Sequence, residues 1–238
     1  MRQFTESFYL NEHLFYGHFG HFLIITAFVT AIFSFGLGIN YFISSEKKNE
    51  SLQQLRIFFW THFWSVMGIL ILLIFLFKNQ YFEYHYIWRH SSRELPWYFI
   101  FSALWEGQEG SFLLWIFWHA ILGLFLWKNM SENKIGALSI LMLVQAFLLT
   151  MILGVDIGGK LIGTNPFILL RDEMNIPILS NPNYLELIKD GNGLNVLLQN
   201  YWMVIHPPVL FLGFASTTVP FALATASLLK RDFTTWIK

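Results

Sequence analysis

The sequence predicts an all-α fold, a polytopic membrane helical bundle with about five transmembrane helices. Three observations lead to this prediction. Hydrophobic residues make up 55% of the 238 residues, and charged residues only 13%, about half the share of a typical soluble domain. Aromatic residues reach 19%, which is typical of proteins that meet membrane interfaces. Apolar segments of about 20 residues, the length that crosses a bilayer, recur along the chain.

Five segments qualify as spans: residues 17–43, 57–77, 111–127, 135–155 and 207–229. The stretch 96–104 is too short to cross a bilayer, so we expect it to lie on the membrane surface or to form a short re-entrant piece. Ser111 is placed to cap the third span. Glu109 just before it suits the positive end of the helix dipole.

The distribution of basic residues predicts the orientation of the spans. Three short segments carry Lys47, Lys48, Arg56, Lys128, Lys134, Lys230, Arg231 and Lys238. The opposite side carries most of the acids, on two longer loops at about 78–110 and 156–205, the second with a short helical candidate at 183–189. We therefore expect an external N-terminus, a cytoplasmic C-terminus and one membrane domain over residues 1–238.

Composition also excludes several functions. The chain has no cysteine, so it offers no disulfide, thiolate metal site or thiol nucleophile. Its formal net charge is zero, and no basic patch indicates binding to nucleic acid. No acidic or basic residue falls clearly inside a span, which counts against an ion-driven transporter.

Histidines are the remaining polar candidates in and near the spans. His18 and His21 share one helix face at the outer end of the first span, as interfacial or functional residues. We expect His62 to be packed or snorkelling, and His119, deeper in the bilayer, to need a partner such as a Ser or Thr of a neighbouring helix. The two histidines expected on the surface of the first outer loop are His85 and His90.

The most informative stretch is residues 192–208, which ends in Ile205-His206-Pro207-Pro208. Proline lacks an N–H and is tolerated mainly in the first turn of a helix, so we expect His206 just before a helix start, where water meets bilayer. An imidazole held there is able to bind haem iron. The residues alone leave a structural role for His206 equally open.

A second informative stretch begins with Leu95-Pro96-Trp97-Tyr98 and continues with Trp105-Glu106-Gly107-Gln108-Glu109-Gly110-Ser111. Helix capping explains Glu109 but not the tryptophans, which also suit an aromatic belt at the membrane interface. Glu106 and Glu109 are equally suited to binding a cationic partner or tuning a nearby histidine.

Together these stretches resemble the CcmF/CcsA family of haem-handling membrane proteins in cytochrome c biogenesis, most closely the CcmF haem-lyase branch. The family carries a Leu-Pro-Trp-Tyr segment, a Glu-Gly-Ser turn before a span, and an Asn-x-Leu-Leu-Gln segment leading into Ile-His-Pro-Pro. Here these fall at residues 95–98, 109–111, 195–199 and 205–208, and the run at 20–22 resembles the family's first span. Val196 departs from the pattern, since many relatives have proline there.

The resemblance implies that His206 is an axial ligand of haem iron on the outer face of the membrane. The site it implies comprises His206, Trp202, Pro207 and Pro208, with weaker candidates His21, Trp97, Trp105 and Glu109. It also implies the cytoplasmic (inner) membrane as location, with a periplasmic functional face. Implied partners are apocytochrome c, a haem chaperone and thiol-reducing components. Because apocytochrome supplies the thiols, a chain without cysteine suits attachment of haem.

The family's tryptophan-rich external segment does not occur in these 238 residues, so the resemblance is to the N-terminal part of a haem lyase. Two alternatives stay open at this point. One is an electron-transfer membrane anchor that binds haem b through paired histidines, such as His21 and His206. The other is a small-solute transporter or a structural scaffold.

Overall fold

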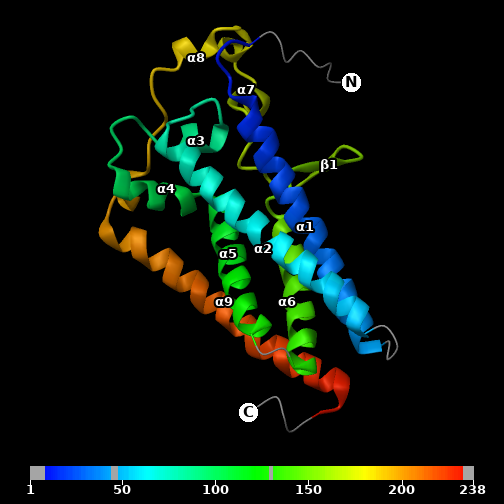
Figure 1. Cartoon of the computed structure of the whole chain (residues 1–238). Helices are drawn as coiled ribbons and strands as arrows, with labels where there is room; N and C mark the ends of the chain where they lie inside the picture. The colour runs from blue at the N-terminus through cyan, green and yellow to red at the C-terminus, as the bar shows by residue number, and fades with distance from the viewer. Residues whose placement is uncertain (1–8, 44–47, 129–130, 233–238) are drawn as a thin grey trace.

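The computed structural model describes residues 9–43, 48–128 and 131–232 (Figure 1). Its elements are α1 (Leu14–Ile43), α2 (Lys48–Lys78), α3 (His85–His90), η1 (Trp97–Phe99), α4 (Ile100–Glu106), α5 (Gln108–Trp127), α6 (Glu132–Thr150), β1 (Val155–Ile157), β2 (Lys160–Ile162), α7 (Leu170–Glu173), η2 (Pro177–Ser180), α8 (Tyr184–Leu187), η3 (Val196–Leu198) and α9 (Tyr201–Lys230). Within these ranges, α1, α2, α5, α6 and α9 are long and apolar enough to cross a membrane. The predicted five spans are confirmed.

The described residues are mostly helical, as an all-α fold implies, with one short exception that the sequence-based prediction did not include. Strands β1 and β2 form an antiparallel hairpin in which Val155 pairs with Ile162. Its turn needs two residues with positive φ, and Gly158 and Gly159 supply them at 62° and 83°. The Asp156 carboxylate accepts the Gly159 N–H at 2.7 Å and closes the turn. A Gly-Gly pair between two short apolar runs is the sequence signal for this hairpin.

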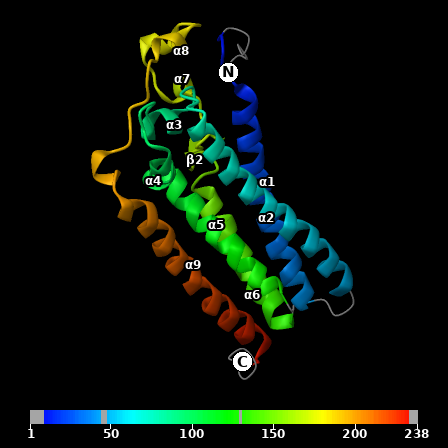
Figure 2. The same ribbon diagram turned by 60° about the vertical axis from the view of Figure 1, so that its left-hand side comes forward.

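The long helices form an elongated bundle. Helices α1 and α2 run side by side along one edge, α5 and α6 lie in the middle, and α9 lies along the opposite edge (Figures 1 and 2). The main core is apolar and fully buried at positions such as Ile24, Leu73 and Leu113. A second apolar cluster, which includes Leu138 and Ala222, joins α9 to α6. Burial of these faces holds the spans together.

The basic segments expected on one side of the membrane meet at one end of the bundle, called here the basic end (Figure 1). The Glu132 carboxylate accepts hydrogen bonds from Lys48 Nζ, at 2.7 Å, and from Lys230 Nζ. It thereby links the first residues of α2 and α6 to the last residue of α9. Lys134 Nζ donates to the Lys128 carbonyl at 3.2 Å. Lys47 and Lys238 lie outside the described residues.

The two long loops gather at the other end, called here the loop end, and pack on each other. The His85 N–H donates to the Ile168 carbonyl at 2.9 Å, and the Asn192 N–H donates to the Trp88 carbonyl at 2.7 Å. An ion pair between Glu12 and Arg171, at 2.8 Å, ties the start of the chain to the second loop. The two loops therefore form one layer over the ends of the helices.

Two short elements in these loops differ from the predicted bounds. The helical candidate at 183–189 forms only the single turn α8, which ends at Leu187. The stretch 96–104 folds as η1 followed by α4, and Figure 1 shows α4 lying across the loop end, beside the start of α9. It does not cross the bundle.

Candidate functional site

His206 lies in the second turn of α9, at the loop end of the bundle. The expectation that it precedes the helix start is wrong, because α9 begins at Tyr201. Asn200 sets this start: its side-chain oxygen accepts the Met203 N–H at 3.1 Å. The helix then continues through both prolines. His206 is thus carried by a regular helix, which fixes its direction relative to the neighbouring turns.

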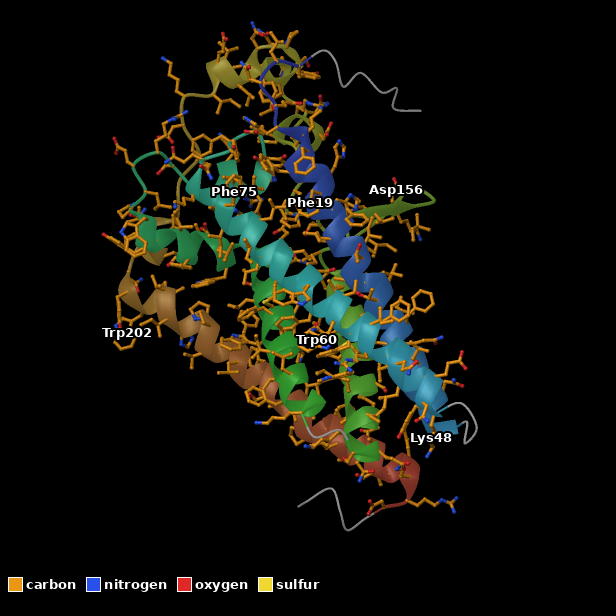
Figure 3. All side chains as sticks on the ribbon, in the orientation of Figure 1. Phe19, Lys48, Trp60, Phe75, Asp156 and Trp202 are labelled. Carbon is orange, nitrogen blue, oxygen red and sulfur yellow. The ribbon has the colours of Figure 1, made fainter. Side chains whose placement is uncertain are left out.

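The face of α9 around His206 is exposed and mostly apolar. Trp202 is one helical turn before His206 on the same face and is 72% exposed. Figure 3 shows Trp202 directed away from the bundle. Ile205 and Val209 are exposed beside them. None of the described residues forms a hydrogen bond with the His206 ring, so its nitrogens are available to a ligand. A flat apolar ring with a central metal fits these surroundings.

Pro207 and Pro208 are half-buried and leave gaps in the hydrogen bonding of the helix. The carbonyl of Met203 would normally accept the N–H of residue 207, which proline lacks. Instead, Trp105 Nε1 of α4 donates to the Met203 carbonyl at 3.0 Å. The Trp105 side chain therefore contacts the backbone of the turn that carries His206.

The other site candidates from the sequence lie elsewhere. Trp97 is exposed on η1, with its ring centroid 6.0 Å from that of Tyr98. Glu109 is in the first turn of α5. Ser111 does not cap that helix, as was expected: Gly107 is the N-cap residue, and Ser111 Oγ donates to the Trp105 carbonyl at 2.9 Å.

A polar cavity of about 780 Å³ lies between α3, the joint of α4 and α5, the second loop from β2 to α7 and the segment that precedes α9. Its polar lining includes His85, Arg89, His90, Glu106, Glu109 and Asn195. Among the described residues, no residue of α9 lines this cavity. The cavity and His206 thus lie apart.

Burial shifts the ionisation of groups around this cavity. Desolvation raises the pKa of the Glu106 carboxyl, and the backbone N–H of Asn195 opposes that rise. Desolvation lowers the pKa of His90 to about 4, against the raising effect of its hydrogen bond to the Tyr86 carbonyl. The expectation that His90 lies on the loop surface is wrong, since it is only 7% exposed. Its imidazole is neutral at physiological pH.

Sequence reasoning missed Tyr86, a buried residue that holds this region together. Its hydroxyl donates to the Leu104 carbonyl at 2.9 Å and accepts the Gly110 N–H at 3.2 Å. It therefore joins the end of α4 to the start of α5. The closely spaced glycines at 107 and 110 are the only sequence signal for such a close approach, and they do not identify the partner.

The remaining histidines of the spans have structural contacts. His62 is fully buried, and its Nδ1–H donates to the Ala27 carbonyl of α1 at 3.0 Å. His119 Nε2 is 2.9 Å from the hydroxyl of Thr218 on α9, the kind of partner expected. Each ring is turned toward a different neighbouring helix. His21 is on α1, on the opposite side of the bundle from the helix of His206 (Figures 1 and 2). Neither His62 and His119 nor His21 and His206 face each other as the two axial ligands of a haem b would.

Comparisons with known proteins agree on one family. The family model described as cytochrome c assembly protein matches residues 105–237, from Trp105 through α9. The cytochrome c-type biogenesis protein CcmF of Escherichia coli (strain K12) is 32% identical over 178 residues, which cover 73% of this chain and 24% of that protein. The NrfE protein of Haemophilus influenzae is 30% identical over 66% of this chain and 22% of its own length.

A solved structure of a cytochrome c haem lyase CcmF has a similar fold. It aligns with a TM-score of 0.70 at 19% identity, covering 93% of this chain and 32% of that one. The chain thus spans about a quarter of the length of the curated relatives it matches. With over half of its residues matched by the family model and five candidate spans, the chain is a multi-pass membrane protein that belongs to the cytochrome c assembly protein family.

Proposed function

We propose that this chain forms the N-terminal membrane part of a cytochrome c haem lyase, and that His206 binds haem iron at the outer face of the membrane. The observation that carries the proposal is the exposed imidazole in the second turn of α9, at the loop end and within the matched segment. Imidazole is a common axial ligand of haem iron.

The surroundings of His206 fit a porphyrin. Trp202 and Ile205 offer exposed apolar surface beside the imidazole, and Pro207 and Pro208 stiffen the turn that carries it. The role of the protein is to hold and orient the haem. The haem supplies two vinyl groups. Each thioether bond joins a cysteine sulfur of apocytochrome c to one vinyl carbon, while the thiol proton goes to the neighbouring carbon.

We further propose the membrane location, the orientation and the partners of this chain. Residues 1–238 form one membrane domain of a larger assembly in the cytoplasmic (inner) membrane, with the N-terminus and the loop end on the periplasmic side. The meeting of the basic segments at the opposite end supports this orientation, because basic residues favour the cytoplasmic side. Haem, apocytochrome c, a haem chaperone and thiol-reducing components are the expected partners.

The substitution His206→Ala tests the proposal in the intact maturation system. We expect covalent haem on the target cytochromes to be abolished, while the protein accumulates in the membrane at its normal level. The matched control is His18→Ala, which removes an exposed histidine on the other edge of the bundle and leaves maturation unchanged. Normal amounts of covalent haem in the His206→Ala strain would refute the assignment.

A further inference from the structure

The turn of α9 that carries His206 has a carbonyl that its own helix does not satisfy. Residues 203 and 207 are four apart, the spacing of an α-helical hydrogen bond, but Pro207 has no N–H to donate. A missing intrahelical bond lets a helix bend at that turn. The direction of His206 therefore depends on what else holds this turn.

Trp105 is the residue that holds it. Its Nε1–H donates to the Met203 carbonyl at 3.0 Å. A helical carbonyl points toward the following turn, so this bond lies beside residues 206 and 207. The contact replaces the hydrogen bond that Pro207 removes.

Trp105 is itself held by neighbours on three elements. Its carbonyl accepts the Ser111 hydroxyl of α5 at 2.9 Å. The preceding carbonyl, of Leu104, accepts the Tyr86 hydroxyl of α3 at 2.9 Å. The Trp105 ring stacks on Phe101 of its own helix, with centroids 6.1 Å apart. A donor fixed in this way transmits the position of α3 and α5 to α9.

We propose that Trp105 is a positioning residue for His206: its indole N–H occupies the carbonyl that Pro207 leaves open and so sets the direction of the imidazole. This inference rests on the proposed function of His206 as a haem ligand. It changes the role of Trp105 from the direct haem contact expected by resemblance to control of the ligand through the backbone. Trp105 and Pro207 then act as one unit.

A double-mutant cycle in the complete haem-loaded maturation complex tests this unit. The first variant, Trp105→Phe, keeps an aromatic ring but removes the donor. The second, Pro207→Ala, gives the Met203 carbonyl a donor from its own helix. We expect Trp105→Phe to lower covalent haem on cytochrome c by up to roughly tenfold, the effect of one lost hydrogen bond to a half-buried carbonyl. In the Pro207→Ala background, the same substitution should change it less than about twofold.

A spectroscopic readout separates positioning from stability. A tilted imidazole changes iron ligation, so Trp105→Phe should shift the Soret band and the midpoint potential of the bound haem. The Pro207→Ala background should cancel that shift. The control Trp64→Phe removes an indole that is 65% exposed on α2, and should leave both readouts unchanged. A benzothienylalanine at position 105, which keeps the indole shape without the N–H, serves if Trp105→Phe does not accumulate.

The possible outcomes separate this inference from the proposed function. If His206→Ala abolishes covalent haem but Trp105→Phe costs the same in both backgrounds, or nothing, the positioning role is overturned and the ligand assignment stands. If His206→Ala leaves covalent haem unchanged, the proposed function itself fails. If His206→Ala abolishes covalent haem, and Trp105→Phe lowers covalent haem only when Pro207 is present, both the ligand assignment and the positioning role are supported.

Discussion

The histidines of this chain differ in what their ring nitrogens contact. His62 and His119 are buried in the bundle and hydrogen-bond to neighbouring helices. His90, within the first loop, is buried, and its Nδ1–H donates to the Tyr86 carbonyl at 2.8 Å. His206 is exposed on α9. The sequence shows the same residue type at each place, and only burial and contacts separate a packing residue from a candidate ligand.

Burial of His90 predicts a pH dependence of stability. Its pKa falls from 6.5 to about 4 on folding, so the unfolded chain binds a proton more readily. The free energy of unfolding should therefore decrease as the pH falls from 6.5 toward 4, by about 3 kcal/mol from this residue, and level off below. Urea unfolding of the detergent-solubilised protein across this range measures the effect.

The comparison is with His90→Gln, which keeps a donor for the Tyr86 carbonyl but does not titrate. Glu106, whose pKa is raised by burial, acts in the opposite direction in both proteins. The difference between the two curves therefore isolates His90. Parallel curves would mean that His90 is solvated in the folded protein.

At the scale of elements, the joint between α4 and α5 explains the Trp-Glu-Gly-Gln-Glu-Gly run. Gly107 separates the two helices, and Tyr86 fills the space beside it. Near the end of α4, two backbone carbonyls accept hydrogen bonds from side chains of other helices. The Leu104 carbonyl accepts from Tyr86 of α3, and the Trp105 carbonyl accepts from Ser111 of α5. Residues 105–111 thus form a sharp turn between α4 and α5, called here the corner, and Trp105 at its start contacts α9.

The corner predicts a strict requirement at position 110. A Cβ on Gly110 would collide with the Leu104 carbonyl and the Tyr86 hydroxyl, and the backbone atom has no way to rotate aside. We expect Gly110→Ala to lower the free energy of unfolding by about 1–3 kcal/mol, as in other overpacked sites. Thermal unfolding in detergent measures this loss.

Gly213 of α9 provides the matched control, because a Cβ there meets no atom within 4 Å. Alanine favours a helix over glycine by about 1 kcal/mol, so Gly213→Ala should be neutral or stabilising. An equal response at the two positions would mean that the corner is looser than described.

At the scale of the whole molecule, charge and loop length separate the two ends. At the basic end, the Glu132 carboxylate accepts hydrogen bonds from Lys48 and Lys230, whereas the loop end contains the cavity and the start of α9. This polarity places the candidate haem ligand opposite the basic segments. The proposed attachment of haem outside the cytoplasm needs this arrangement, with the loop end facing outward.

The polarity predicts the topology of the chain in the membrane. Reporter fusions after Lys128 and after Asp232 should be active as cytoplasmic reporters, and fusions after Lys160 and after Asp172 as external ones. A pair of enzymatic reporters, each active on one side only, measures this. The reverse pattern would place His206 on the cytoplasmic side and contradict its proposed role.

Much of this architecture follows from local sequence. Long apolar segments predict the five spans, because a helix that crosses lipid must be apolar over most of its length. Asn200 and the glycines of the hairpin turn mark local boundaries through caps and positive φ. The position of Pro207 predicts a helix start near residue 207, but α9 starts at Tyr201, because the rule that proline belongs in a first turn assumes that a lost backbone bond has no substitute.

What the sequence by itself determined is the membrane class, the number of spans and the grouping of the basic segments, and through the resemblance to a family motif it singled out His206 as a candidate ligand. The tertiary structure alone decided that Trp105 meets the Met203 carbonyl, that Tyr86 joins α4 to α5 and that His90 is buried. The reason is physical. Composition and periodicity report how each segment meets lipid or water, while the partner of a buried polar group lies far along the chain and is selected only when the helices pack.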